Sequence, residues 1–468
     1  MSDNFCLGKS KYIQDKFGTL HLFMMNKEEN NRATGYILFE KFPEWLWHIT
    51  AAAIIISRLL QYAGQEWCVV FPDTGGYEEF DFFKFLQGHS TNGRAPLYPL
   101  LMDFTEKVFG AGNYLPLVLA QIAFSMVSLI LLAGILENIG IKAPWAQLCL
   151  FVYASTPATT GWDTCMMTES LALSATVAFF YCVIKYLRTL RAHWLLTAIL
   201  LTFFLIFLRP QFLTYWAILL FFCALRMVCP EKKQERKTLI KAVLALALCG
   251  AVCMAYAIEF HKQFGIYSLT DARARQDLYT CIWRGYYVEL DDTEIVNTLK
   301  TAAVDKGIWE VCDLGMEYGI VRVNKTTHDF FKQHFARYLM DTIHTMKLDC
   351  GNVFEGYALK NPNAPNLFKT IYPVFPTIFG HIYVAFAFIG VISSGIVMAS
   401  RWVIERKIPW LWAALFTISF STVIPTYFVT CDEYMRTMCS VLPYLFCIMG
   451  LALQWAADAL QDHSVKMC

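Results

Sequence analysis

The chain has little charge for its length. Only 16% of its 468 residues are charged, whereas about 25% is usual in soluble domains. Long apolar runs replace the missing charge, and 56% of the residues are hydrophobic. The formal net charge of +1 gives no basis for a nucleic-acid partner. We therefore expect an integral membrane protein.

Several chemical signatures are also missing. The 16 cysteines form no CxxC pair and no zinc-ligand spacing, so we interpret most of them as small apolar packing residues. No Ser/His/Asp arrangement and no internal repeat is evident. The histidines of the long polar segment show no tight ligand spacing, at His328, His334 and His344. The cofactor is therefore unknown, and the sequence neither requires nor excludes a divalent metal.

Apolar runs of roughly 20 residues predict membrane-spanning helices. Because Arg209-Pro210 interrupts the fifth and sixth runs, those two could also form one kinked helix. We expect an all-α polytopic membrane protein with roughly ten transmembrane helices, at about 44–62, 113–137, 144–161, 166–187, 193–208, 211–228, 238–258, 377–400, 408–429 and 436–457.

Basic residues in short loops give the orientation, because Lys and Arg are retained on the cytoplasmic side. If residues 1–43 are inside and successive spans cross the membrane in alternate directions, every basic cluster between closely spaced spans falls on the cytoplasmic side. These clusters are Lys142; Lys185, Arg188 and Arg191; Arg226, Lys232, Lys233, Arg236, Lys237 and Lys241; and Arg401, Arg406 and Lys407. The tail at 458–468 is then cytoplasmic, and two long segments, 63–112 and 259–376, lie outside.

The predicted organisation follows from these spans. Residues 1–43 lack the apolar core of a signal peptide and are expected to form a cytoplasmic tail. Residues 44–258 form an N-terminal transmembrane catalytic module that includes the outside loop 63–112. Residues 259–376 are too long for a passive connector, so we expect a mainly helical extracytoplasmic subdomain. Residues 377–457 supply the C-terminal transmembrane helices.

Two acids stand near the predicted outer interface. Asp73 precedes a stretch from Gly76 to about Leu86 in which aromatic and acidic residues alternate as in an interfacial helix. Asp is also a favoured N-cap, so its position alone leaves capping open. Glu169 lies about one turn inside an apolar helix, where an ionisable residue usually faces a cavity or a partner. A first-turn acid stabilised by the helix dipole is the alternative.

Two arginines match these acids in depth. Arg209 lies at the outer junction of two predicted spans, and Glu433 and Arg436 open the last one. Snorkelling to the interface is the alternative for each arginine. Together, Asp73, Glu169, Arg209, Glu433 and Arg436 come from five places in the chain and fall at one interface. Such a set suits a hydroxyl acceptor and a phosphate leaving group.

These motifs together resemble a known family. In order they read Pro72-Asp73-Thr-Gly-Gly-Tyr77, Arg94-Ala-Pro-Leu-Tyr98-Pro99, Thr168-Glu169, Arg209-Pro210 and Glu433-Tyr-Met-Arg436 before Pro443. The sequence resembles integral-membrane glycosyltransferases of the GT-C type, above all the dolichyl-phosphate-mannose–protein mannosyltransferase and aminoarabinose transferase-like group. Thr74 stands where the family has a second acid, which puts a paired-acid metal site there in doubt.

The resemblance implies transfer of a sugar from a polyprenyl-phosphate-linked donor to an acceptor hydroxyl outside, with inversion. The acceptor is a glycolipid, a glycan or a protein. Asp73 and Glu169 would be the catalytic carboxylates, with Asp73 as the general base. The other site residues would bind substrate, and the two deep arginines would neutralise the phosphate. These substrate-binding residues are Tyr77, Arg94, Tyr98, Arg209, Glu433 and Arg436.

Two other classes stay open. A transporter or flippase of a lipid-linked glycan would place its substrate site near the bilayer midplane. An O-antigen polymerase or ligase would also have a large outside loop. We expect the membrane to be a bacterial cytoplasmic membrane, with the endoplasmic reticulum as the alternative.

Overall fold

The computed structural model describes residues 44–89, 93–228, 235–349, 361–379, 383–429 and 434–467. Within these ranges the chain is helical and has no strand, and one isolated bridge pairs Val69 with Cys165. The prediction of an all-α fold is confirmed for this part of the chain. The predicted tail at 1–43 lies outside it.

Eight helices among the described residues are long enough and apolar enough to cross a membrane, which indicates an integral membrane protein. Two of them include a short lead-in: η1 (Pro210–Phe212) precedes α11, and α22 (Tyr434–Met438) with η3 (Cys439–Val441) precedes α23. The eight are α2 (Glu44–Gly64), α6 (Leu115–Asn138), α9 (Glu169–Thr189), α11 (Leu213–Val228), α12 (Glu235–Phe264), α20 (Tyr383–Glu405), α21 (Trp410–Val429) and α23 (Leu442–Met467).

The structure does not support ten such spans among the described residues. The predicted span 144–161 is divided into α7 (Ala143–Ser155) and the four-residue α8 (Pro157–Thr160), because the residue before a proline is pushed out of the helical region. The predicted span 193–208 is α10 (Ala192–Leu208), which has only 17 residues. The Arg209-Pro210 pair separates α10 from α11, so these are two helices.

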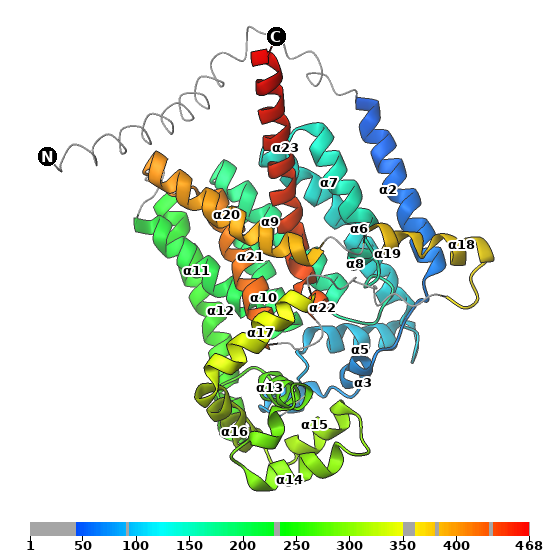
Figure 1. Ribbon diagram of the computed structural model, residues 1–468, viewed down its shortest axis with the longest axis vertical. Helices are drawn as coiled ribbons and strands as arrows, with labels where there is room; N and C mark the ends of the chain where they lie inside the picture. The colour runs from blue at the N-terminus through cyan, green and yellow to red at the C-terminus, as the bar shows by residue number, and fades with distance from the viewer. Residues whose placement is uncertain are drawn as a thin grey trace, which may run out of the picture.

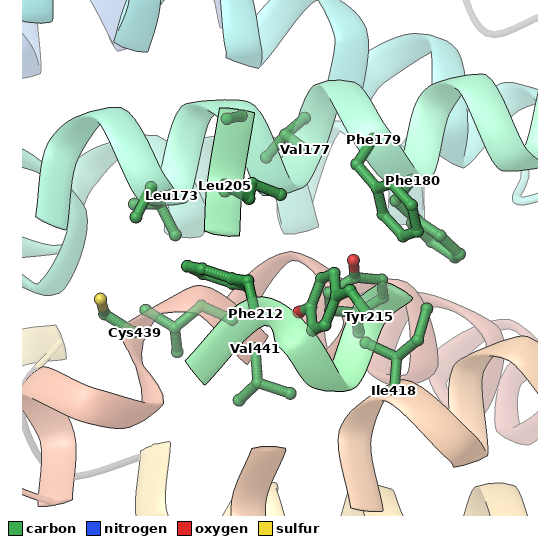
Figure 2. Packing of buried hydrophobic residues seen from close by; sticks show 14 of the residues in the cluster. Leu173, Val177, Phe179, Phe180, Leu205, Phe212, Tyr215, Ile418, Cys439 and Val441 are labelled. Carbon is green, nitrogen blue, oxygen red and sulfur yellow. The ribbon is translucent and has the colours of Figure 1, made fainter. Parts of the chain in front are cut away.

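Helix α9 lies at the centre of the bundle. Of its apolar stretch 78% is buried, against 28% for that of α12. Figure 2 shows its side chains Leu173, Phe179 and Phe180 facing Phe212 and Tyr215 of the η1–α11 segment. A helix buried on nearly all sides holds its first residue in a fixed place, and in α9 that residue is Glu169.

A helical subdomain follows α12. It comprises α13 (Ala272–Trp283), η2 (Tyr286–Glu289), α14 (Thr293–Ala302), α15 (Ile308–Met316), α16 (Ile320–Gln333) and α17 (Phe335–Asp349). Its core is a separate hydrophobic cluster that includes Leu278, Leu299 and Val323. Figure 1 shows α13 to α16 at the end of the bundle opposite the start of α2 and the end of α23.

Described residues at both ends of the segment 259–376 belong to the bundle. Helix α12 continues to Phe264, and α18 (Asn366–Ile371), which is followed by α19 (Val374–Phe379), packs against α2. The backbone N–H of Asn361 donates to the carbonyl of Gly64 at 2.9 Å. The described helices of the subdomain, α13 to α17, lie within residues 272–349.

The segment between α2 and α6 contains α3 (Pro72–Glu78), α4 (Phe82–Leu86) and α5 (Leu97–Phe109). The interfacial helix predicted from Gly76 to Leu86 is thus two short helices. They are separate because Asp81 caps α4: its carboxylate accepts hydrogen bonds from the backbone N–H groups of Phe83 at 2.9 Å and Lys84 at 3.0 Å.

Candidate active site

The segment between α2 and α6 is bound to the turn that precedes α9. The backbone N–H of Met166 donates to the carbonyl of Val69 at 3.0 Å, and the N–H of Val69 donates to Thr164 at 3.3 Å. The buried hydroxyl of Thr74 donates to the Met166 carbonyl at 3.2 Å. The Thr74 hydroxyl therefore has a structural role at this position. These contacts hold α3 beside the start of α9.

Asp73 lies in the first turn of α3 but does not cap it, because the N-cap is Phe71. Its two carboxylate oxygens accept hydrogen bonds from two guanidiniums. Arg94 donates to Oδ1 at 2.7 Å, and Arg436 of α22 donates to Oδ2. Burial alone would raise the pKa of Asp73, but Arg436 and Arg94 outweigh burial and lower it to about 2. The carboxylate is therefore ionised at neutral pH.

Arg436 also binds the second acid. Its Nε donates to Oε1 of Glu169 at 2.5 Å, and Arg209 approaches the same oxygen at 3.1 Å. The Glu169 side chain is fully buried, so its charge is matched only by protein groups. We call Asp73, Glu169, Arg94, Arg209 and Arg436 the charged network. Three guanidiniums against two carboxylates give it a formal charge of +1.

Aromatic side chains hold Arg94 in place. Its guanidinium lies 5.1 Å from the ring centre of Tyr77, which packs 5.0 Å from the ring of Tyr98. The Tyr98 hydroxyl donates to Oε1 of Gln121 at 2.8 Å. A side chain at Gly76 would be crowded, because a Cβ there would lie 2.8 Å from Nε of Arg94. Both tyrosines are buried, and Tyr77 supports the arginine from one side.

The charged network meets a cavity of about 690 Å³ between the bundle and the subdomain. Asp73, Arg94 and Arg436 line it, while Glu169 and Arg209 lie behind Arg436. The bundle contributes Phe71, Asp73, Gly75, Gly76, Glu79, Arg94, Trp162, Met167 and Arg436. The subdomain contributes Arg275, Trp309, Asp313, Met316 and Glu317.

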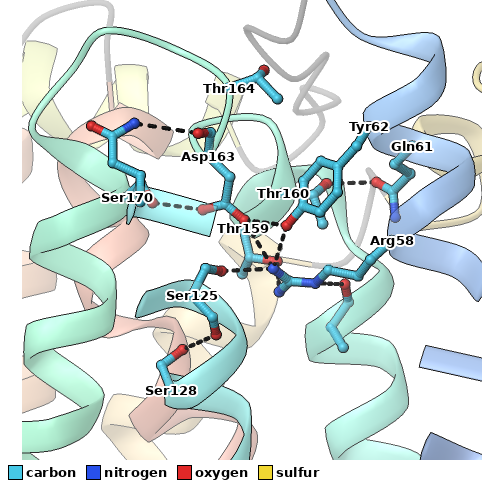
Figure 3. Close-up of polar contacts among 12 residues, drawn as sticks. Arg58, Gln61, Tyr62, Ser125, Ser128, Thr159, Thr160, Asp163, Thr164 and Ser170 are labelled. Carbon is cyan, nitrogen blue, oxygen red and sulfur yellow. Dashed lines mark hydrogen bonds and ion pairs between the residues drawn. The ribbon is translucent and has the colours of Figure 1, made fainter. Parts of the chain in front are cut away.

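A second polar cluster lies under the turn before α9 (Figure 3). Arg58 of α2 donates to Oδ2 of Asp163 at 2.9 Å and to the Ala154 carbonyl at 2.9 Å. The hydroxyls of Tyr62 and Ser170 also donate to Asp163, each at 2.6 Å. Because these groups are buried and mutually satisfied, they fix the turn that leads into Glu169.

The structure brings together five of the eight predicted site residues, those of the charged network. Tyr77 packs against Arg94 of this network, and Tyr98 packs against Tyr77. Glu433 lies outside the described residues. Among the described residues, no group of three or more His, Cys, Asp or Glu side chains could hold a metal ion.

Sequence reasoning missed two sets of residues. The subdomain wall of the cavity carries no recognisable motif. The cluster around Asp163 did leave a signal, because Arg58 stands inside an apolar run, where a charged residue usually has a partner.

No protein-family model matches the chain, and no curated protein matches it. A functional proposal therefore depends on the chemistry of the site and on the resemblance of its motifs.

Proposed function

We propose that this protein is a glycosyltransferase that moves a sugar from a polyprenyl-phosphate-linked donor to an acceptor hydroxyl, with inversion. The observation that carries the proposal is the position of Arg436. It binds Asp73 and Glu169 at once, on the wall of a cavity large enough for a sugar and an acceptor group. The remaining partners are the lipid bilayer, which would hold the donor's polyprenyl tail, and the acceptor.

The charge of the network suits this donor. A phosphodiester carries one negative charge, which balances the formal +1 of the network. When the bond between the sugar and the phosphate breaks, the leaving polyprenyl phosphate gains a second negative charge. Guanidiniums that already point at that place stabilise developing charge without reorganisation. Arginine also binds phosphate through two parallel hydrogen bonds.

Asp73 is the proposed base. Without substrate, both of its oxygens are bound to guanidiniums, and a carboxylate with a pKa of about 2 is a weak base. A donor phosphate that draws Arg94 and Arg436 toward itself would release a carboxylate oxygen and raise its basicity. The acceptor oxygen then forms a bond to the anomeric carbon, the bond from that carbon to the phosphate oxygen breaks, and Asp73 takes the hydroxyl proton. Glu169 would position Arg436 and Arg209.

The location of the site favours transfer over transport. Transporters bind substrate near the bilayer midplane, whereas the cavity lies where the bundle meets the subdomain. A polymerase or ligase that works mainly through its large loop would not need acids from α3 and α9. We propose that this end of the bundle faces the outside of a bacterial cytoplasmic membrane.

The proposal can be tested with purified protein in lipid nanodiscs and a polyprenyl-phosphate-linked hexose. We expect Asp73→Asn to keep its fold and to release polyprenyl phosphate at least about 100-fold more slowly, because a general base contributes roughly 100- to 10,000-fold. Asp103→Asn is the matched control, because Asp103 is exposed on α5, pairs with Lys107 at 2.6 Å and does not line the cavity. The control should have wild-type activity.

Two results would contradict the proposal. One is a folded Asp73→Asn protein with near-normal release of polyprenyl phosphate, which would leave Glu169 as the leading candidate base. The other is a wild-type protein that neither binds polyprenyl phosphate nor releases it from any lipid-linked sugar.

A further inference from the structure

The wall of the cavity that faces the charged network comes from the subdomain. Trp309 and Asp313 lie one turn apart on α15, Glu317 follows that helix, and Arg275 comes from α13. None of them belongs to a motif of the resemblance. Their side chains reach the same cavity as Asp73, so whatever occupies this side lies opposite the proposed base.

Trp309 provides a fixed aromatic surface. The Trp309 ring lies 4.0 Å from the ring of Tyr279, which is only 3% exposed. Trp309 itself is 47% exposed although it is large and apolar. An aromatic ring that is supported on one side and open on the other offers its free face to a ligand. The carbon-bound hydrogens of a pyranose ring pack well on such a face.

Polar groups surround this surface. Asp313 forms an ion pair with Arg275, and Glu317 is exposed beside them. Carboxylates accept hydrogen bonds from hydroxyls, and a guanidinium donates to them. One arginine against two carboxylates gives this wall a formal charge of −1, and Glu79 on the opposite wall adds another acid. An acidic wall disfavours an acceptor that carries phosphate or carboxylate groups.

We infer that the subdomain wall is the acceptor site and that the acceptor is a neutral carbohydrate stacked on Trp309. This inference rests on the proposed function, because it assigns the other substrate of the same cavity. The charged network would hold the anionic donor, and the acidic, aromatic wall would hold the acceptor hydroxyl toward Asp73.

Binding of glycans to the purified protein in nanodiscs tests the inference. Probes would be neutral oligosaccharides and the same oligosaccharides with a phosphate or a uronic acid, measured by saturation-transfer NMR and titration. We expect the neutral series to bind wild type, and Trp309→Ala to weaken it roughly 10-fold or more. Trp283→Ala is the matched control: Trp283 is 42% exposed, belongs to the same subdomain and does not line the cavity.

The outcomes separate the inference from the proposed function. Binding of polyprenyl phosphate is measured in parallel and reports on the donor site alone. If polyprenyl phosphate binds but no neutral oligosaccharide does, the inference is wrong and the proposed function stands. The same holds if Trp309→Ala binds glycan as well as Trp283→Ala, or if the acidic series binds more tightly. If polyprenyl phosphate does not bind at all, the proposed function fails first.

Discussion

Replacing Arg436 by lysine tests whether the site needs only a positive charge there or also the planar guanidinium. The guanidinium uses Nε for Glu169 and Nη2 for Asp73, so one planar group joins two carboxylates from α9 and α3. A lysine ammonium keeps the positive charge but is a point donor on a different stem. Arg436→Lys is therefore expected to keep one of the two hydrogen bonds and to lose the other.

The size of the effect follows from that loss. A hydrogen bond to a charged group contributes about 1.5–3 kcal/mol. If the lost bond aligns the guanidinium for the donor phosphate, the affinity for polyprenyl phosphate should fall roughly 10- to 150-fold. Arg436→Ala is less informative, because it leaves the fully buried Glu169 with fewer partners and costs stability as well.

The assay is titration calorimetry of a short-chain polyprenyl phosphate into the protein in nanodiscs. Arg401→Lys is the control, since Arg401 lies on α20, is 42% exposed and pairs with Glu405 at 3.9 Å. Wild-type affinity in both variants would refute the reasoning and reduce Arg436 to a structural residue. Equal losses in both would show that the effect is not specific to the site.

Three further predictions concern topology, pH and stability. A membrane-impermeant thiol reagent should label a cysteine at Asn363 in intact cells and not one at Gln234, and the reverse pattern would overturn the orientation. The pKa of Asp73 is lowered from its ordinary 3.8 to about 2, so its ion pairs should stabilise the fold above pH 3.8 and lose this effect as the pH falls toward 2. The difference in melting temperature between wild type and Asp73→Asn should therefore be constant from pH 8 to 5 and shrink below pH 4. Arg58→Met should destabilise the fold by about 3–5 kcal/mol, because it leaves the buried carboxylate of Asp163 without its positive partner. Adding Asp163→Asn to this variant should recover part of the lost melting temperature. A wild-type melting temperature in Arg58→Met, or no recovery in the double variant, would contradict a stabilising Arg58–Asp163 pair.

Much of the site followed from the sequence, because polar residues are costly at membrane depth. Asp73, Glu169, Arg209 and Arg436 stood out since each interrupts or borders an apolar run. The charge rule for loops then assigned them to one interface. The structure brings their side chains into direct contact. Their catalytic roles stay predictions.

Other features could not be read from local patterns. Hydropathy counts apolar residues without regard to backbone breaks, so it predicted one span where Thr156 and Pro157 divide α7 from α8. The aromatic and acidic alternation after Asp73 was interpreted as one helix, because the capping role of Asp81 depends on the fold. Trp309 meets the site only through the packing of α15, which no local sequence pattern encodes.

The most direct test of the central claim is a cryo-electron microscopy structure of the protein with polyprenyl phosphate bound. We predict phosphate density in the cavity of about 690 Å³, within hydrogen-bond distance of Arg436 and Arg94, with the Asp73 carboxylate released from at least one guanidinium. Phosphate density at another place on the protein, with the bonds from Arg436 to Asp73 and Glu169 unchanged, would contradict the account.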